Sequence, residues 1–379
     1  MKKNFIIIAV FVLFSCVNTI KPTDDYRINL RWIKSSAGED GEKATKGILW
    51  ALAYVGAELP KESIKKGIFL NENQIFQLDF SALGFDENAL KAWSKLITFS
   101  KKTEEYKKYG SIDLSRFLVF TVYSPWHYYQ ITGVSTSLDS FFDNSLNSAK
   151  FDFFPVTHSS VTDGHRLLKY RIESNVEKSK FLAIEGDGKL TDSTFREAEY
   201  EAIDLMKNGQ LRYAIYNLNG KLSDFAQKKY SSAGNPAKCM WCHEGVLAPL
   251  FTENQAVRGY KLPQDFNSEM LQTQLIINIY RNSRNSTIDF NIHKDHELSE
   301  ILYTSFMEPS AERLAQEWKI SVEEVKAKLE TLKTHRNHEF VFLGELFDRN
   351  EVEKYAPFQS IPFPSSIREQ NNNELNIFK

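Results

Sequence analysis

Residues 239–243 read Cys-Met-Trp-Cys-His, a Cys-x-x-Cys-His pentapeptide that constrains this chain more than any other feature. Two thiols three positions apart can each add to a vinyl group of haem, and the adjacent imidazole can then reach the iron. The motif therefore predicts one covalently bound haem c. Cys239 and Cys242 are the expected attachment points, and His243 is the expected proximal ligand of the iron.

Three other interpretations of the two thiols make different demands on the sequence. A thioredoxin-like redox pair needs the motif at the start of a helix that follows a strand, and the polar loop at residues 231–236 predicts no such strand. A zinc site normally needs a second cysteine pair, but the chain has only three cysteines. A disulfide between Cys239 and Cys242 fits the spacing but leaves His243 unexplained.

Through these five residues the chain resembles the c-type cytochromes. The resemblance covers the motif and the helical stretch after it. It implies a helical cytochrome c-like domain that passes single electrons to and from redox partner proteins. Many members have a glycine-rich stretch directly after the motif, whereas residues 244–249 of this chain read Glu-Gly-Val-Leu-Ala-Pro. The region before the motif is also longer than a bare electron carrier needs. A peroxidase-like haem oxidoreductase and a haem-based redox sensor that binds a partner are therefore the alternative functions.

The resemblance also implies a distal iron ligand downstream of the motif, often a methionine close to a proline. Met307 precedes Glu308 and Pro309 and is the expected distal ligand. Met270 is the other downstream methionine, but it lies on a predicted helix, where packing in a core is the commoner role. Ligation by two histidines would use one of four downstream residues, His293, His296, His335 or His338.

The N-terminal residues resemble a bacterial lipoprotein signal peptide. Two lysines precede an apolar run over residues 5–14, which is too short to span a bilayer. Residues 13–16, Leu-Phe-Ser-Cys, resemble a lipobox, which implies cleavage before Cys16 and lipidation of that thiol. Haem c is attached outside the cytoplasmic membrane. Both motifs thus predict an extracytoplasmic protein, lipid-anchored to a bacterial membrane and facing the periplasm or the cell surface.

Hydrophobic periodicity predicts an α+β chain with helical regions on both sides of an antiparallel β unit. The predicted divisions are a lipoprotein signal peptide at 1–15, a tether at 16–25, a mainly helical domain at 26–148, a β-rich unit at 149–222, a cytochrome c-like haem domain at 223–345 and an extended tail at 346–379. The end of that tail is expected to be disordered.

Local signals in the first two regions support this division. Helices are expected over residues 41–55 and after Asp86, which is a suitable N-cap, with one short strand at 76–80 between them. Periodicity does not decide whether residues 114–123 form a helix or a strand. Asn208-Gly209 predicts a tight hairpin, because both residues tolerate positive φ.

In the third region, a helix is expected over residues 262–280, with Leu271, Leu275 and Ile276 on its buried face. Ser321 and Glu324 have the spacing of a capping box and should begin a further helix.

The charge balance and one aromatic segment bear on the remaining possible partners. Lys and Arg number 47 against 49 Asp and Glu, so no basic excess favours nucleic acid as a partner. Residues 124–129 read Ser-Pro-Trp-His-Tyr-Tyr and could line a substrate pocket. Their commoner role is a proline-led turn with its rings packed in a core.

Overall fold

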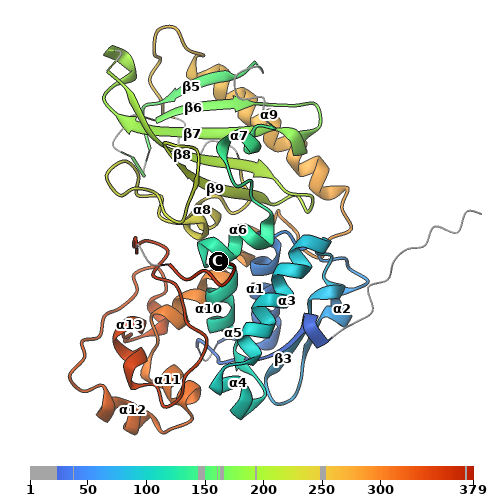
Figure 1. Ribbon diagram of the computed structural model, residues 1–379, viewed down its shortest axis with the longest axis vertical. Helices are drawn as coiled ribbons and strands as arrows, with labels where there is room; N and C mark the ends of the chain where they lie inside the picture. Colours follow the sequence, from blue (N-terminus) through green and yellow to red (C-terminus); the bar gives the residue numbers. More distant parts are fainter. Residues whose placement is uncertain are drawn as a thin grey trace, which may run out of the picture.

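The computed structural model describes residues 24–36, 38–143, 150–159, 161–162, 166–192, 194–247, 253–371 and 374–379. These residues form thirteen α-helices and two β-sheets, so the predicted α+β class is confirmed. The larger sheet forms one half of the molecule, and the smaller sheet with most of the helices forms the other (Figure 1). Cys16 and the predicted signal peptide lie outside the described residues.

The strands are β1 (Arg27–Arg31), β2 (Ile68–Leu70), β3 (Ile75–Asp79), β4 (Ile112–Asp113), β5 (Asp152–Val156), β6 (Arg166–Arg171), β7 (Lys180–Asp187), β8 (Arg196–Leu205), β9 (Leu211–Asn217) and β10 (Leu222–Ser223). The α-helices are α1 (Gly41–Tyr54), α2 (Ile64–Gly67), α3 (Glu87–Lys101), α4 (Glu104–Tyr109), α5 (Leu114–Thr121), α6 (Pro125–Thr132), α7 (Leu138–Phe141), α8 (Pro236–His243), α9 (Pro263–Asn282), α10 (Glu297–Met307), α11 (Ala311–Trp318), α12 (Val322–Lys328) and α13 (Arg349–Val352).

The helical half is built around α1, α3, α5 and α10, with the small sheet β2-β3-β1-β4 at its side. The expected helices α1 and α3 and the expected strand β3 are confirmed, and Asp86 caps α3 by accepting from the backbone N–H of Ala89. The ambiguous stretch at 114–123 becomes the helix α5. Its start is fixed because the Asp113 side chain accepts from the N–H of Arg116, at 2.7 Å.

The larger sheet is an antiparallel meander in the order β10-β9-β8-β7-β6-β5, which confirms the strands expected in this part of the chain. Asn208 and Gly209 form the turn between β8 and β9, and Gly209 has a φ of +84°, as the hairpin prediction required. Side chains alternate between the two faces of each strand, so every second residue of β6 to β9 points to the face that α8 and α9 cover.

Two sets of hydrogen bonds join the sheet to the helical half. The Asn208 amide donates to the carbonyl oxygens of Ala53 and Ala57, at 2.8 and 3.0 Å, and so fixes the hairpin tip on the end of α1. The hydroxyls of Tyr128 and Tyr129 on α6 accept from backbone N–H groups of β9, at 3.1 and 3.2 Å. Both tyrosines are buried, so the core-packing interpretation of residues 124–129 is confirmed for these rings.

The C-terminal helices are held by a buried cluster of charges. Glu317 on α11 accepts from Arg349 on α13, at 3.0 and 2.8 Å, and from Arg116 on α5, at 3.2 Å. The Phe306 ring lies 4.1 Å from the guanidinium of Arg349 and 5.0 Å from that of Arg116. The expected capping box at the start of α12 is present, since Ser321 and Glu324 bond each other's backbone.

The predicted buried face of α9 is wrong. Leu271, Leu275 and Ile276 are 56%, 62% and 45% exposed, whereas Met270 and Ile277 are 3% and 1% exposed. The helix has apolar residues on two sides, and the side that meets the sheet is the one that carries Met270. Periodicity within one helix could not decide between the two sides, because the choice depends on the partner surface.

The predicted disorder at the end of the tail is wrong for residues 374–379. The N–H of Ile377 donates to Nε2 of His127, at 3.3 Å, and the Phe378 ring packs 5.7 Å from that imidazole. The extended tail predicted from residue 346 is wrong for residues 349–355, which form α13 and a 3₁₀ turn. The stretch after them is extended, as expected, and it buries Ile361 and Ile367.

Candidate functional site

The motif lies on α8, which packs against β9 of the large sheet. The Asn235 side chain caps the helix by accepting from the N–H of Ala237, at 2.8 Å. The helix ends immediately after His243, where Glu244 adopts a left-handed conformation with a φ of 49°. Residues 239, 242 and 243 are spaced i, i+3 and i+4, which places all three side chains on one helix face.

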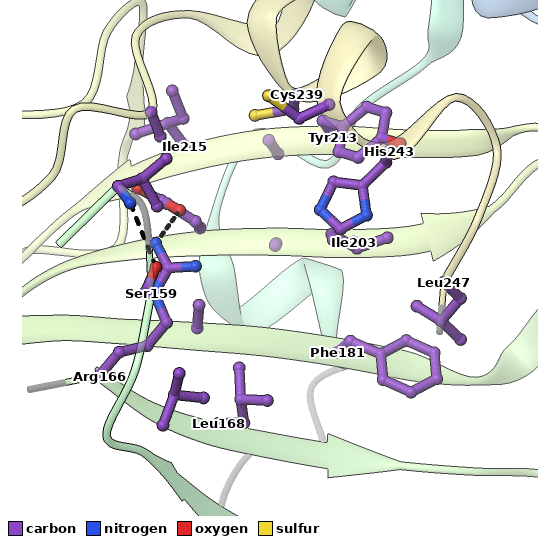
Figure 2. Close-up of a pocket in the computed structure, with 18 of the residues that line it drawn as sticks. Ser159, Arg166, Leu168, Phe181, Ile203, Tyr213, Ile215, Cys239, His243 and Leu247 are labelled. Atoms are coloured by element: carbon purple, nitrogen blue, oxygen red, sulfur yellow. Dashed lines mark hydrogen bonds and ion pairs between the residues drawn. The ribbon is translucent and has the colours of Figure 1, made fainter. Parts of the chain in front are cut away.

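That face borders a cavity over the large sheet (Figure 2), to which Phe266 and Met270 of α9 also contribute. Cys239, Cys242 and His243 all line it. Most of the other lining side chains are apolar, and they include Leu168, Phe181, Ala183, Ile203, Ile215, Leu247, Phe266 and Met270. A mainly apolar cavity directly at the motif suits a flat, mostly apolar macrocycle.

The His243 imidazole is oriented as a metal ligand would be. Its Nδ1 lies 2.9 Å from the carbonyl oxygen of Val246, and a carbonyl only accepts, so Nδ1 carries the proton. Nε2 is therefore the unprotonated nitrogen, and it faces the cavity. Burial lowers the pKa of His243, which favours the neutral ring that a metal needs. The ring also lies against Tyr213, with the ring centres 5.7 Å apart.

The two thiols are free and weakly acidic. No disulfide joins Cys239 and Cys242 in the described structure. Burial raises the pKa of both thiols, and the nearby Glu201 carboxylate raises that of Cys239 further. A dithiol redox centre depends on a lowered thiol pKa, so this environment disfavours the thioredoxin-like interpretation. Within the described ranges no three His, Cys, Asp or Glu side chains gather as a metal site.

The loop after His243 is tied to α9. Gln274 accepts from the N–H of Leu247, at 2.6 Å, and Arg281 donates to the carbonyl oxygens of Gly245 and Gly209, at 2.6 Å each. These bonds hold the Val246 carbonyl in place beneath the imidazole. Met270 lies one helical turn before Gln274, so the same helix that positions the loop also forms a wall of the cavity.

One end of the cavity is polar. Arg166 on β6 donates to Glu201 on β8, at 2.8 Å, and also forms an ion pair with Glu185 on β7. Arg166 and Glu201 both line the cavity, and Figure 2 shows Arg166 on the side away from His243. Glu199 is buried beside them, and burial raises its pKa to about 7. The sequence analysis missed this group, although strict alternation along β6 and β8 places Arg166 and Glu201 on the same inward face as Leu168 and Ile203.

The structure does not bring Met307 to this site. Met307 is the last residue of α10 and is buried, but it is not among the described residues that line the cavity, which include Met270 instead. The four histidines considered as ligands are not among the described lining residues either. His296 bonds Glu244 at 2.9 Å and Glu300 at 3.1 Å, while His338 is largely exposed.

No protein-family model, curated protein or solved structure matches this chain. The site is therefore interpreted from its own geometry and chemistry.

Proposed function

We propose that this chain is a monohaem c-type protein that passes single electrons. Thioether bonds from Cys239 and Cys242 would attach the haem, and His243 would bind its iron from the proximal side. The observation that carries the proposal is the orientation of His243. Its Nδ1–H is held by the Val246 carbonyl, and its free Nε2 faces a cavity that both thiols share.

When bound, the haem would supply the one-electron chemistry, and the protein would control access and orientation. Val246 sets the tautomer and the plane of the imidazole. The apolar walls from Phe181, Ile203 and Leu247 would shield the faces of the bound ring from water. Ala183 lies between larger neighbours on the floor, and its small side chain leaves room for a flat ring.

The proposed location is outside the cytoplasm, with a lipid anchor at Cys16 and redox proteins as partners. The signal-like N-terminus and the requirement of haem c attachment for an extracytoplasmic site support this location. In the described part of the chain, no helix is long and apolar enough to span a bilayer.

The cavity also favours a second candidate, a haem oxidoreductase or sensor that binds a small ligand. A pure electron carrier does not need a charged pair inside its haem cavity, and burying one is costly. Arg166 and Glu201 are such a pair.

The test of the main proposal is covalent haem. The full chain should be produced in a host that assembles haem c, and its haem should stay with the polypeptide through denaturing electrophoresis. The double variant Cys239→Ala/Cys242→Ala should lose the haem stain, whereas Cys16→Ser should keep it. His243→Ala should retain attached haem but change the absorption spectrum. A correctly exported wild-type protein without the stain would refute the proposal.

A further inference from the structure

We infer that Arg166 and Glu201 form a recognition site for a small exogenous anion, which binds the haem on the face opposite His243. The inference rests on the proposed haem attachment and specifies what else the same cavity binds. Under this inference the iron would be open to exogenous ligands on that face and would not be bound there by a methionine.

The positions of His243 and Arg166 on opposite sides of the cavity support this site. His243 enters at one end, and its Nε2 edge is directed toward the side on which Arg166 lies (Figure 2). A ring held by Nε2 would then present its other face to the guanidinium. Leu168 and Ala183 pair across the strands in the row next to Arg166 and Glu185, and both line the cavity with small or apolar side chains.

Arg166 retains donor capacity toward the cavity. Its Nη2 donates to Glu201, and its Nε faces Glu185. No described residue accepts a hydrogen bond from Nη1, which points into the cavity in Figure 2. A guanidinium fixed by two carboxylates is a rigid donor, and a charge-assisted bond from it to an anion is stronger than a neutral one.

The surrounding charges limit what the site accepts. Glu185, Glu199 and Glu201 all approach Arg166, so the guanidinium is more than neutralised when these groups are ionised. One oxygen of Glu201 is buried without a partner. Such a site favours a small ligand that can share a proton with a carboxylate, and it disfavours a large or strongly charged anion.

Met270 is the residue that could bind the iron on the same face in place of the anion. It is the lining residue with a thioether, and it is 3% exposed. It packs with Phe154, Tyr170 and Phe266 in a separate apolar cluster. These neighbours account for its burial without a bond to iron.

The test is a fluoride titration of the purified, haem-loaded ferric protein at pH 7, followed by absorption. Wild type should bind fluoride. In Arg166→Leu the dissociation constant should rise about ten- to hundredfold, from the loss of one charge-assisted hydrogen bond. In Glu201→Gln it should fall, on the order of tenfold, because a nearby negative charge is removed. Glu201→Gln also keeps the test decisive if Arg166→Leu does not fold.

Matched controls lie on the same strands. Arg171 follows on β6 but points to the opposite face, and Glu197 is exposed on β8, so Arg171→Leu and Glu197→Gln should bind fluoride like wild type.

Two results would overturn the inference. One is unchanged fluoride binding in both Arg166→Leu and Glu201→Gln. The other is a wild-type protein that does not bind fluoride and that shows the near-infrared band of methionine-ligated ferric haem. In that case the band would be lost in Met270→Ala and kept in Met307→Ala. Either result leaves covalent haem intact. Absence of haem after denaturing electrophoresis would instead remove the proposed function itself.

Discussion

The imidazole of His127 should make this protein lose stability in mild acid. His127 is fully buried on α6, with Nδ1 2.5 Å from the carbonyl oxygen of Phe120 and Nε2 accepting from the N–H of Ile377. Burial lowers the pKa of His127 from 6.5 to about 4. Protonation would place a second N–H against the Ile377 donor, so the neutral ring is the one that fits.

The magnitude follows from the difference between the folded and unfolded pKa. Between pH 6.5 and about 4 the unfolded chain binds a proton that folded His127 does not, so the free energy of unfolding falls as the pH falls. A difference of roughly 2.5 pKa units, at about 1.4 kcal/mol each, corresponds to about 3 kcal/mol. This contribution is complete above pH 6.5 and is lost near pH 4.

The assay is urea unfolding at several pH values between 7 and 4 for wild type and His127→Gln. Glutamine can still donate to Phe120 and accept from Ile377, but it does not titrate. The stability difference between the two proteins should therefore change by about 3 kcal/mol across this range. His338→Gln, at an exposed site, is the control and should follow wild type. Parallel pH profiles for wild type and His127→Gln would refute the reasoning.

Two further predictions concern the anchor and the buried charges. Wild-type protein should fractionate with membranes and Cys16→Ser should be released into the soluble fraction; soluble wild type with an unmodified N-terminus would exclude the lipid anchor. Glu317→Gln should destabilise the fold by about 3–5 kcal/mol in urea unfolding, because Arg116 and Arg349 lose their shared buried partner. Glu312→Gln on the same helix replaces an exposed carboxylate and should change stability little, and equal effects of the two variants would contradict the role of the buried cluster.

Sequence signals that span a few residues predicted the structure correctly where that structure depends on local geometry. Asn208-Gly209 predicted its hairpin, and Asp86 and Ser321 predicted helix starts. Each of these depends on backbone preferences, which the neighbouring sequence determines.

The features that the sequence did not predict depend on contacts between distant segments. Leu271 and Met270 are adjacent and both apolar, and only the position of the sheet makes one exposed and the other buried. The same limit applies to Met307, whose position close to a proline resembled that of a distal ligand although the end of α10 does not bring it to the cavity. Arg166 and Glu201 come from strands separated by β7, so their pairing could only be found from the sheet register.

The path of the tail has a consequence for the order in which the chain can fold. The buried guanidinium of Arg116 is satisfied by Glu353 and by the carbonyl of Ile361, and His127 is satisfied by Ile377. Arg116 and His127 therefore gain these partners only after more than two hundred further residues have been synthesised. The helical half cannot complete its packing during synthesis until those later residues have emerged.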